Sequence, residues 1–215
     1  EAEPMAHASL ADVAASQGDG YFVGHSAAAA ELAILETAGL PEDARLGEEG
    51  IEPYKVEQGD YGEVVVRGNH VNRGYIDNPE ANRKNKLYQL NGDVWHRTGD
   101  VAYQDAEGNL WLTGRVKDTV RHLGRSIQPL VLEAKIDAIA GIQRAALIAS
   151  KKTGNGVVVI ELLEGASERE VLAKVRQLLE AEDSGEIPLR VISMIPMDGR
   201  HNSKIDRPKL REVIE

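Results

Sequence analysis

The stretch of the chain that most restricts its fold is 94–128, which has the pattern of a β-hairpin with a charged cluster at the outer end of each strand. Two short apolar runs, 101–103 and 110–113, flank a loop of Asp, Ala, Glu, Gly and Asn. The glycine can take the positive φ that a tight loop requires. Because an antiparallel hairpin brings its outer ends together, we predict that Asp100 and Arg115 lie close together.

An aspartate beside an arginine at one end of a hairpin has two interpretations. A carboxylate can accept hydrogen bonds from the paired hydroxyls of a sugar, and a guanidinium can hold phosphate or ribose oxygens. The plain alternative is a surface ion pair that contributes little energy. These two residues alone favour the ion pair.

The composition is that of an ordinary globular protein, with 42% hydrophobic and 28% charged residues among 215, enough for one or two domains. The net charge of −10 argues against nucleic acid as a partner. No apolar run approaches the length of a membrane span, so no transmembrane segment is expected. The lack of cysteine fits a reducing cytoplasm, which is the predicted location.

The charge changes at Gly114. Before it there are 8 Lys and Arg against 20 Asp and Glu, a net −12; from it onward there are 17 against 15, a net +2. The change predicts two units with different surfaces and fits a mildly cationic unit that closes over an anionic ligand, although unselected surface composition gives the same shift.

The residue pattern also differs on the two sides of this glycine. In the first half, short strands at 21–23, 30–36 and 62–68 join the hairpin in a small, mostly antiparallel β unit. The segment 40–61, acidic and interrupted by Pro and Gly, is expected to be an exposed connection, and 69–92 a polar loop.

The second half reads as a compact α+β unit of about 100 residues. Asn155-Gly156 predicts a hairpin turn between two apolar strands. Ser167 and Glu170 have the spacing of a capping box at the start of a helix. The expected elements are helices at 130–139, 168–182 and 208–214 and strands at 142–149, 157–163 and 189–195.

Several familiar sites are not present in the sequence. There is no Gly-Lys dipeptide for a P-loop, no Gly-x-Ser-x-Gly elbow for a hydrolase and no His-x-x-x-His pair for a metal. The function must therefore be inferred from other motifs.

Five blocks in order supply that combination, and with them the chain resembles the carboxy-terminal part of the adenylate-forming superfamily, which includes acyl-CoA synthetases, amino-acid adenylation domains and luciferases. The blocks are 1–4; 62–68 with 73–75 and 79–80; 97–100; 114–118 with Gly124, Pro129 and Glu133; and 202–207.

The resemblance implies an α+β fold in three parts. Residues 1–113 would be the carboxy-terminal part of a large amino-terminal domain, its β-barrel-like subdomain. Residues 114–118 would form a hinge, and 119–215 a small mobile α+β domain. We therefore expect a fragment that is inactive by itself, whose partner is the missing amino-terminal part of the same enzyme.

The resemblance also assigns roles to single residues. Lys204 would contact the α-phosphate of ATP and the substrate carboxylate during adenylation, although a loop lysine is ordinarily a solvated spectator. Asp100 would accept from both ribose hydroxyls, and Arg115 would contact ribose or phosphate. Each assignment is an expectation carried by the position of the residue in its block.

Three further residues take roles in the same way. Lys117 corresponds to the hinge, for which the alternative is a plain linker lysine. Gly124 lies on a strand expected to come over the path of a thiol acceptor. Glu1 would contact the Mg²⁺ bound to ATP.

The implied reaction joins ATP and a carboxylic acid, a fatty or β-hydroxy acid, into an acyl-adenylate. Coenzyme A is a possible acceptor, but Leu123 stands where many acyl-CoA synthetases have arginine. The segments 94–97, 108–111 and 200–204 are similar to those of olefin β-lactone synthetases, which close a ring without coenzyme A. The alternative class is a non-catalytic binding or regulatory module on the same scaffold.

Overall fold

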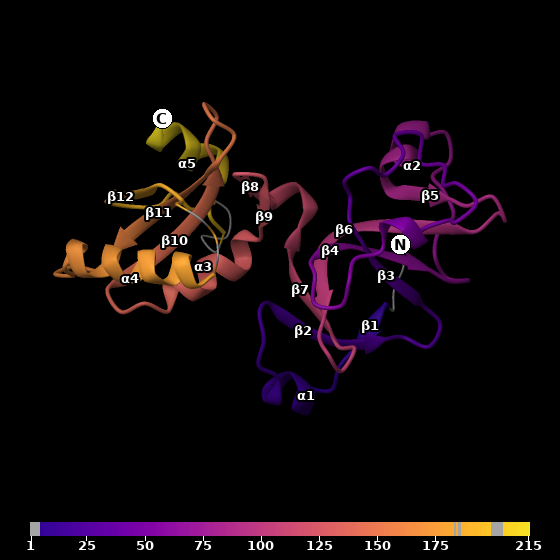
Figure 1. Cartoon of the computed structure of the whole chain (residues 1–215), viewed down its shortest axis with the longest axis horizontal. Coiled ribbons are helices and arrows are strands. Elements are labelled where there is room, and N and C mark those ends of the chain that lie inside the picture. Colours follow the sequence, from indigo (N-terminus) through magenta and orange to yellow (C-terminus); the bar gives the residue numbers. More distant parts are fainter. Residues whose placement is uncertain (1–4, 183, 185, 199–203) are drawn as a thin grey trace. The chain divides into compact units, whose positions relative to one another are not determined.

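The computed structural model describes residues 5–182, 184, 186–198 and 204–215. The chain divides into two compact units, Glu1–Lys117 and Asp118–Glu215, whose elements are labelled in Figure 1. Each unit has its own sheets and its own core, and each is described separately.

The first unit is built on one antiparallel sheet that curls into a half-barrel (Figure 1). Its strand order is β1-β2-β7-β6-β4-β3, and β5 pairs with β6. The strands are β1 (Ala6–His7), β2 (Tyr21–Ser26), β3 (Glu31–Leu35), β4 (Gly62–Arg67), β5 (Lys86–Tyr88), β6 (Val94–Gln104) and β7 (Leu110–Arg115), and the helical segments are α1 (Leu10–Ala15), η1 (Glu52–Tyr54), α2 (Pro79–Asn85) and η2 (Val116–Asp118), the last of which crosses into the second unit.

Strand β4 lies between β6 and the edge strand β3, and its run of three valines is buried on both faces. Side chains alternate across a strand. Val65 therefore packs into the cluster of Leu35, Ala44, Leu46, Ile51, Leu87 and Trp95, while Val64 packs on the opposite face with Ala102 and Leu110. A continuous apolar run is thus the sequence of a strand covered on both sides.

Of two connections predicted to be exposed or irregular, 40–61 is mostly exposed as expected but buries a few apolar residues, and 69–92 is not an irregular loop as predicted. In 40–61, Ala44, Leu46 and Ile51 are buried against β4 because single apolar residues turn inward between the Pro and Gly breaks. The segment 69–92 holds α2 and β5, and its Lys86 is fully buried, with Nζ donating to the Asn72 carbonyl.

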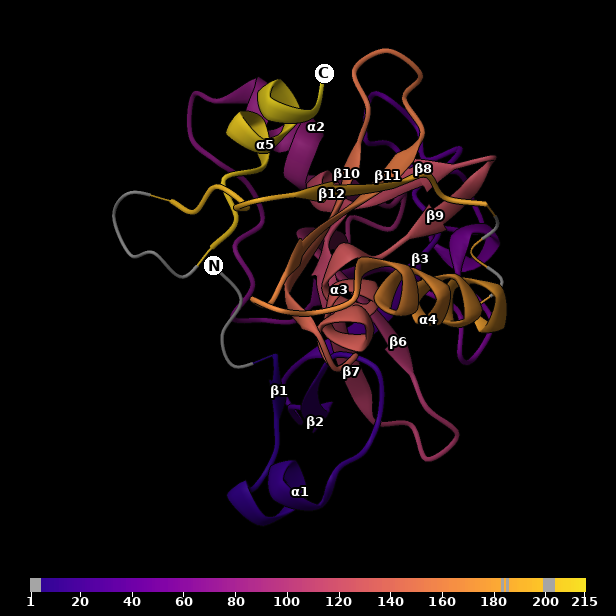
Figure 2. The same ribbon diagram turned by 90° about the vertical axis from the view of Figure 1, so that its left-hand side faces the viewer.

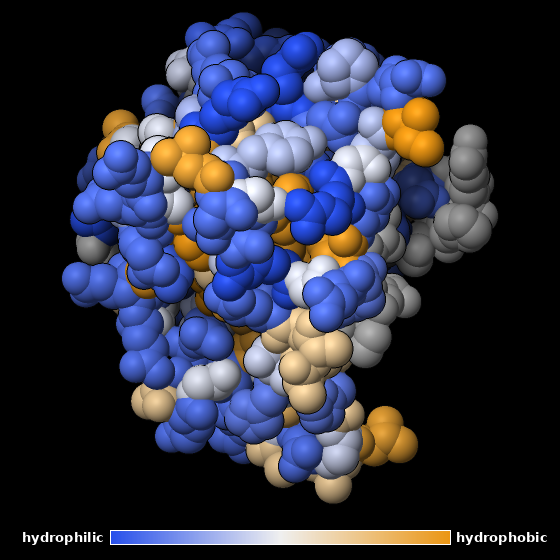
Figure 3. Space-filling view, turned by 90° about the vertical axis from the view of Figure 1, so that its right-hand side faces the viewer, coloured by the Kyte–Doolittle hydropathy of each residue, from blue (hydrophilic) through white to orange (hydrophobic). Residues whose placement is uncertain are grey.

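The face shown in Figure 3 has hydrophobic side chains among hydrophilic ones. Large apolar side chains of the first unit that are mostly exposed include Leu10 on α1 and Ile76. Helix α1 buries none of its residues and is held at its start by a capping box between Ser9 and Asp12. Among the described residues, no helix has the length and apolar character needed to cross a membrane.

The second unit has a three-stranded sheet in the order β10-β11-β12 and a separate hairpin of β8 and β9. Helices α3 and α4 cover one face of the sheet and α5 covers the other (Figure 2). The elements are β8 (Val120–His122), β9 (Arg125–Ile127), α3 (Pro129–Asp137), β10 (Ile142–Ala149), β11 (Gly156–Leu162), α4 (Glu168–Ala181), β12 (Leu189–Ile192) and α5 (Arg207–Ile214).

The hydrophobic clusters in the core of this unit are built from aliphatic side chains. All nine aromatic residues of the chain, one Phe, two Trp and six Tyr, precede residue 118. Val171, Val175 and Leu179 form the buried stripe of α4, as its helical spacing predicts. Fluorescence from Trp95 and Trp111 therefore reports on the first unit.

The hairpin predicted between β10 and β11 is confirmed, but its turn is not Asn155-Gly156: Gly156 already pairs with Ala149 in the ladder, and the loop is 150–155, in which Gly154 takes φ +72°. The capping box predicted at Ser167 is wrong. Ser167 does precede α4, but its side chain makes no capping hydrogen bond. The apolar stripe of α4 packs into the core, so the helix forms without the capping box that the spacing of serine and glutamate predicted. The α+β class is confirmed.

Candidate active site

The β6–β7 hairpin brings Asp100 and Arg115 together, as predicted. The two residues are directly paired in the antiparallel register, and Arg115 Nε lies 2.8 Å from Asp100 Oδ1. At the other end of the hairpin, Asp105 closes the loop by accepting from the backbone N–H groups of Glu107 and Asn109, at 3.1 and 2.8 Å. The turn thus sets the pairing of 102–104 with 110–112, and a one-residue register shift between Val101 and Ala102 then places Asp100 opposite Arg115.

The Asp100 carboxylate is poorly solvated. Its side chain is 19% exposed, against 55% for Arg115. Burial raises the pKa of Asp100 above its usual value, Arg115 opposes this, and the nearby Glu63 adds to it. A ligand that donates hydrogen bonds to this carboxylate, as two vicinal hydroxyls would, stabilises its charged form.

Asp100 is displayed by a bulge in β6. Glu63 pairs with Val101 and Val65 pairs with Arg97, so two steps along β4 face four along β6. The two extra residues of β6 lie in 98–100, within the 97–100 block on which the family resemblance rests in part. Bulges of this kind re-aim a side chain and are frequent beside active sites.

A set of local hydrogen bonds holds the bulge. Thr98 Oγ1 donates to the Val64 carbonyl at 2.8 Å and accepts from the Asp100 N–H at 3.0 Å. The Gly99 N–H donates to Glu63 Oε1 at 3.1 Å. Sequence reasoning missed the part played by Glu63, since nothing in its strand showed which face its side chain would take.

A cavity of about 540 Å³ opens on the same side of the sheet as Asp100. Among the described residues that line it, Asp100 is the one ionisable residue and the others are apolar: Met5, Ala6, Val23, Leu32, Val64, Asp100, Leu110 and Leu112. An apolar hollow with one polar group is the usual form of a small-molecule site.

Replacing Asp100 by asparagine should raise the free energy of unfolding of the first unit at pH 7. The carboxyl has a raised pKa in the folded state, so its contribution to stability is present below the usual value of 3.8 and is lost as the pH rises through the folded-state pKa. Asparagine has no proton to lose. Urea unfolding followed by tryptophan fluorescence should show a gain at pH 7 that shrinks toward pH 4; lower stability at pH 7 would contradict this account.

The candidate hinge and acceptor residues occupy distinct local structures. Lys117 lies in η2, at the point where the chain divides into its two units. Gly124 occupies the tight turn between β8 and β9 with φ +84°, and Leu123 beside it has φ +49°. The Leu123 N–H donates to Asn155 Oδ1 at 3.2 Å, which ties this turn to the β10–β11 hairpin.

Lys204 belongs to the second unit and is exposed. Its carbonyl accepts from the Asp198 N–H at 2.8 Å, and Met197 bridges to Ile205, so the two ends of its loop are joined at the base. Three residues later Arg207 opens α5 and pairs with Glu133 of α3 through two contacts of 2.8 Å. The base of the lysine loop is therefore anchored to the core of its unit.

The described residues contain no group of three or more His, Cys, Asp or Glu side chains placed to hold a metal ion. Glu1, the metal contact implied by resemblance, lies outside the described residues. Residues 199–203 also lie outside the described residues, and the last two of them belong to the block 202–207 that contains Lys204.

Comparisons with known proteins agree with the motif pattern, although no family model matches the chain. The olefin beta-lactone synthetase of Stenotrophomonas maltophilia is 34% identical over 71% of this chain and 29% of its own length. The 2-hydroxy-7-methoxy-5-methyl-1-naphthoate–CoA ligase of Streptomyces carzinostaticus is 29% identical over 71% of this chain and 27% of its own length. The chain thus spans under a third of either relative.

The fold is also that of solved members of the same group. The ATP-bound structure of MatB from Rhodopseudomonas palustris superposes with a TM-score of 0.62 at 23% identity, over 89% of this chain and 35% of that one. The ordered motifs, the related sequences and the shared fold together place this chain in the adenylate-forming superfamily, over the part of those enzymes that it matches.

Proposed function

We propose that this chain is the nucleotide-holding and lysine-bearing portion of an AMP-forming enzyme that activates a carboxylic acid. The reaction joins the acid to the α-phosphate of ATP, forms the acyl-adenylate and releases pyrophosphate. The observation that carries the proposal is the Asp100–Arg115 pair, displayed by a bulge beside an apolar cavity. A plain surface ion pair needs neither the bulge nor the hollow.

Each residue has a role that follows from its chemistry. Asp100 accepts from the two ribose hydroxyls, and Arg115 donates to ribose or phosphate oxygens. The Lys204 ammonium is a compact charge with three donors, which suits the charge that grows on the phosphate and carboxylate oxygens as the new bond forms. Its exposure leaves it available to a ligand.

Lys117 is proposed as the pivot that lets Lys204 approach and withdraw. The division of the chain at this residue supports the idea, because hinges concentrate backbone change in a few residues between rigid units. Magnesium belongs to the proposal as the ion that accompanies ATP. Since the described residues form no metal site, no step is assigned to it.

For the substrate we propose a fatty or β-hydroxy acid, with ring closure as the second step and transfer to coenzyme A as the alternative. The synthetase relative favours the first. At the β8–β9 turn the exposed Leu123 side chain has no charge to offer a phosphorylated acceptor, whereas the exposed Arg121 and Arg125 on either side of the turn keep coenzyme A as the alternative. A longer polypeptide that includes these residues is incubated with ATP and a β-hydroxy acid, with and without coenzyme A. Mass spectrometry of the product then distinguishes a lactone from a thioester.

The 215 residues by themselves should not catalyse exchange between ATP and pyrophosphate, whereas a longer polypeptide that includes them should. The chain has no phosphate loop, and it spans under a third of its relatives. Radiolabelled pyrophosphate exchange measures both. Exchange by the 215 residues alone would contradict the prediction that they need the rest of the enzyme. If no longer polypeptide catalyses exchange, the non-catalytic module is favoured.

A further inference from the structure

We infer that Glu63 is a positioning residue for Asp100, an inference that rests on the ribose-binding role proposed above. Glu63 lies on β4 and is only 3% exposed. A carboxylate is costly to bury unless hydrogen bonds and an opposite charge compensate it. The partners of Glu63 therefore indicate what this buried charge stabilises.

The Glu63 carboxylate holds the two residues that flank Thr98. Its Oε2 accepts from Arg97 Nε at 3.0 Å and from Arg97 Nη2 at 2.6 Å, while its Oε1 accepts from the Gly99 N–H at 3.1 Å. All three donors lie on β6, at or beside the bulge. One side chain of β4 thus replaces the ladder hydrogen bonds that the bulge removes.

The bulge in turn sets the direction of Asp100. Gly99 has φ +73°, a conformation in which its N–H points at Glu63. Thr98 bonds to the Asp100 N–H through its hydroxyl, and its carbonyl lies 3.4 Å from Arg115 Nη1. Without Glu63 the Gly99 N–H and the guanidinium of Arg97 lose their acceptor. A slip of β6 by one residue would turn Asp100 to the other face of the sheet.

Glu63 also acts on Asp100 through its charge, since it contributes to the raised pKa of that carboxyl. Two substitutions remove this charge and differ in what they leave of the geometry. Glu63→Gln has no charge and keeps one acceptor oxygen of the same reach, enough for the Gly99 N–H or for Arg97 but not for both. Glu63→Ala removes both the acceptor and the charge.

The test compares the affinity of the full chain and its variants for AMP and for 2′,3′-dideoxy-AMP, measured by NMR titration. The unsubstituted chain should prefer AMP by about tenfold or more, because hydrogen bonds to a charged acceptor are the strong ones. Glu63→Ala should bring the ratio close to one while the affinity for the dideoxy nucleotide stays unchanged. A purely structural role would weaken the binding of both nucleotides alike.

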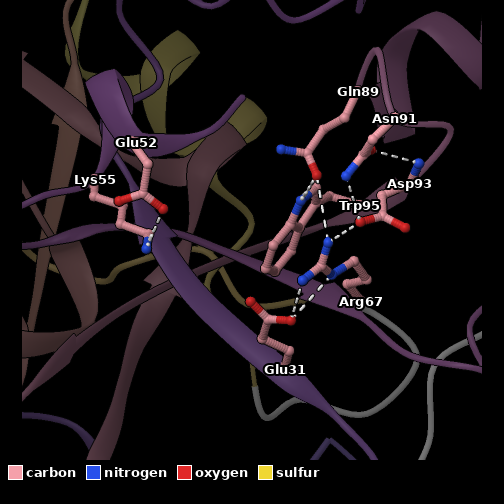
Figure 4. A network of polar contacts seen from close by, with 8 residues as sticks. All are labelled: Glu31, Glu52, Lys55, Arg67, Gln89, Asn91, Asp93 and Trp95. Carbon is pink, nitrogen blue, oxygen red and sulfur yellow. Dashed lines mark hydrogen bonds and ion pairs between the residues drawn. The ribbon is translucent and has the colours of Figure 1, made fainter. Parts of the chain in front are cut away.

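Glu31→Ala is the matched control for Glu63→Ala. Glu31 is a carboxylate of the neighbouring strand β3 that also pairs with an arginine of the sheet, Arg67. Figure 4 shows that Arg67 also contacts Asp93, so it keeps an acidic partner in this variant. The Glu31 pair has no hydrogen bond to the bulge. The preference for AMP should be unchanged.

Each result decides a different point. If Glu63→Ala keeps the preference for AMP, the positioning inference is wrong. If the unsubstituted chain shows no preference and Asp100→Asn changes nothing, the ribose role fails, while the inference can still be judged without nucleotide. In that case the backbone N–H resonances of Gly99 and Asp100 should move in Glu63→Ala and stay in place in the Glu31 control, and unmoved resonances in Glu63→Ala overturn the inference. If Glu63→Ala does not fold, the same resonances are compared in Glu63→Gln.

Discussion

Replacing Lys204 by alanine in the AMP-forming enzyme should lower the rate of adenylate formation by about 10²- to 10³-fold, the range typical for loss of one group that stabilises transition-state charge. The loss should fall mainly on kcat, because the amine acts on charge that develops during the reaction. Folding should be unaffected, since the side chain is exposed. ATP–pyrophosphate exchange and thermal unfolding measure the two effects.

The control for this variant is Lys209→Ala. Lys209 is an exposed lysine on α5, in the same unit and five residues further along. Its removal takes away the same charge and the same length of side chain, and it should leave the exchange rate unchanged. Equal rates for the two variants would mean that Lys204 is a solvated loop residue, and the catalytic proposal would fail.

The second large effect concerns the anchor below the lysine loop. Arg207→Met should destabilise the second unit by about 3–5 kcal/mol, because it leaves the nearly buried Glu133 carboxylate without its cation. Burial raises the pKa of Glu133, and the Arg207 pairing opposes that rise. The variant can relieve the cost by protonating Glu133, so the loss should grow as the pH rises above the usual value of 4.5.

Urea unfolding followed by far-ultraviolet circular dichroism measures this loss, because α3, α4 and α5 are the longer helices of the described chain. Tryptophan fluorescence should show the first unit unchanged. The control is Lys135→Met, a change on the same helix α3. It breaks a more exposed ion pair with Glu182 at the end of α4 and should cost at most about 1 kcal/mol. Glu133→Leu combined with Arg207→Met should recover much of the loss.

Much of the fold could be predicted because local chemistry and tertiary structure agree. The loop between β10 and β11, where Gly154 takes φ +72°, and the β-branched valine run of β4 each have a short-range reason for their conformation. The errors occurred where packing decides. The burial of Ala44 and Leu46 depends on a strand distant in sequence, and the capping box at Ser167 had the correct spacing but no hydrogen bond.

The candidate site divides in the same way. The proximity of Asp100 and Arg115 followed from hairpin geometry alone and is confirmed at 2.8 Å. The bulge did not follow, because two extra residues in one strand become visible only when its partner strand is known. Glu63 was missed for this reason, and the roles of Lys204, Lys117 and Gly124 remain proposals that came from motif order.

The aliphatic core of the second unit has a consequence for the division of tasks within a nucleotide site. A purine is ordinarily gripped by stacking on a ring, and from residue 118 onward the chain has no ring of Phe, Trp or Tyr to offer. That unit can supply charge, hydrogen bonds and methyl groups. Stacking of adenine on a Phe, Trp or Tyr ring must therefore come from outside it, and exchanging this unit between related enzymes should leave intact a base preference that depends on such a ring.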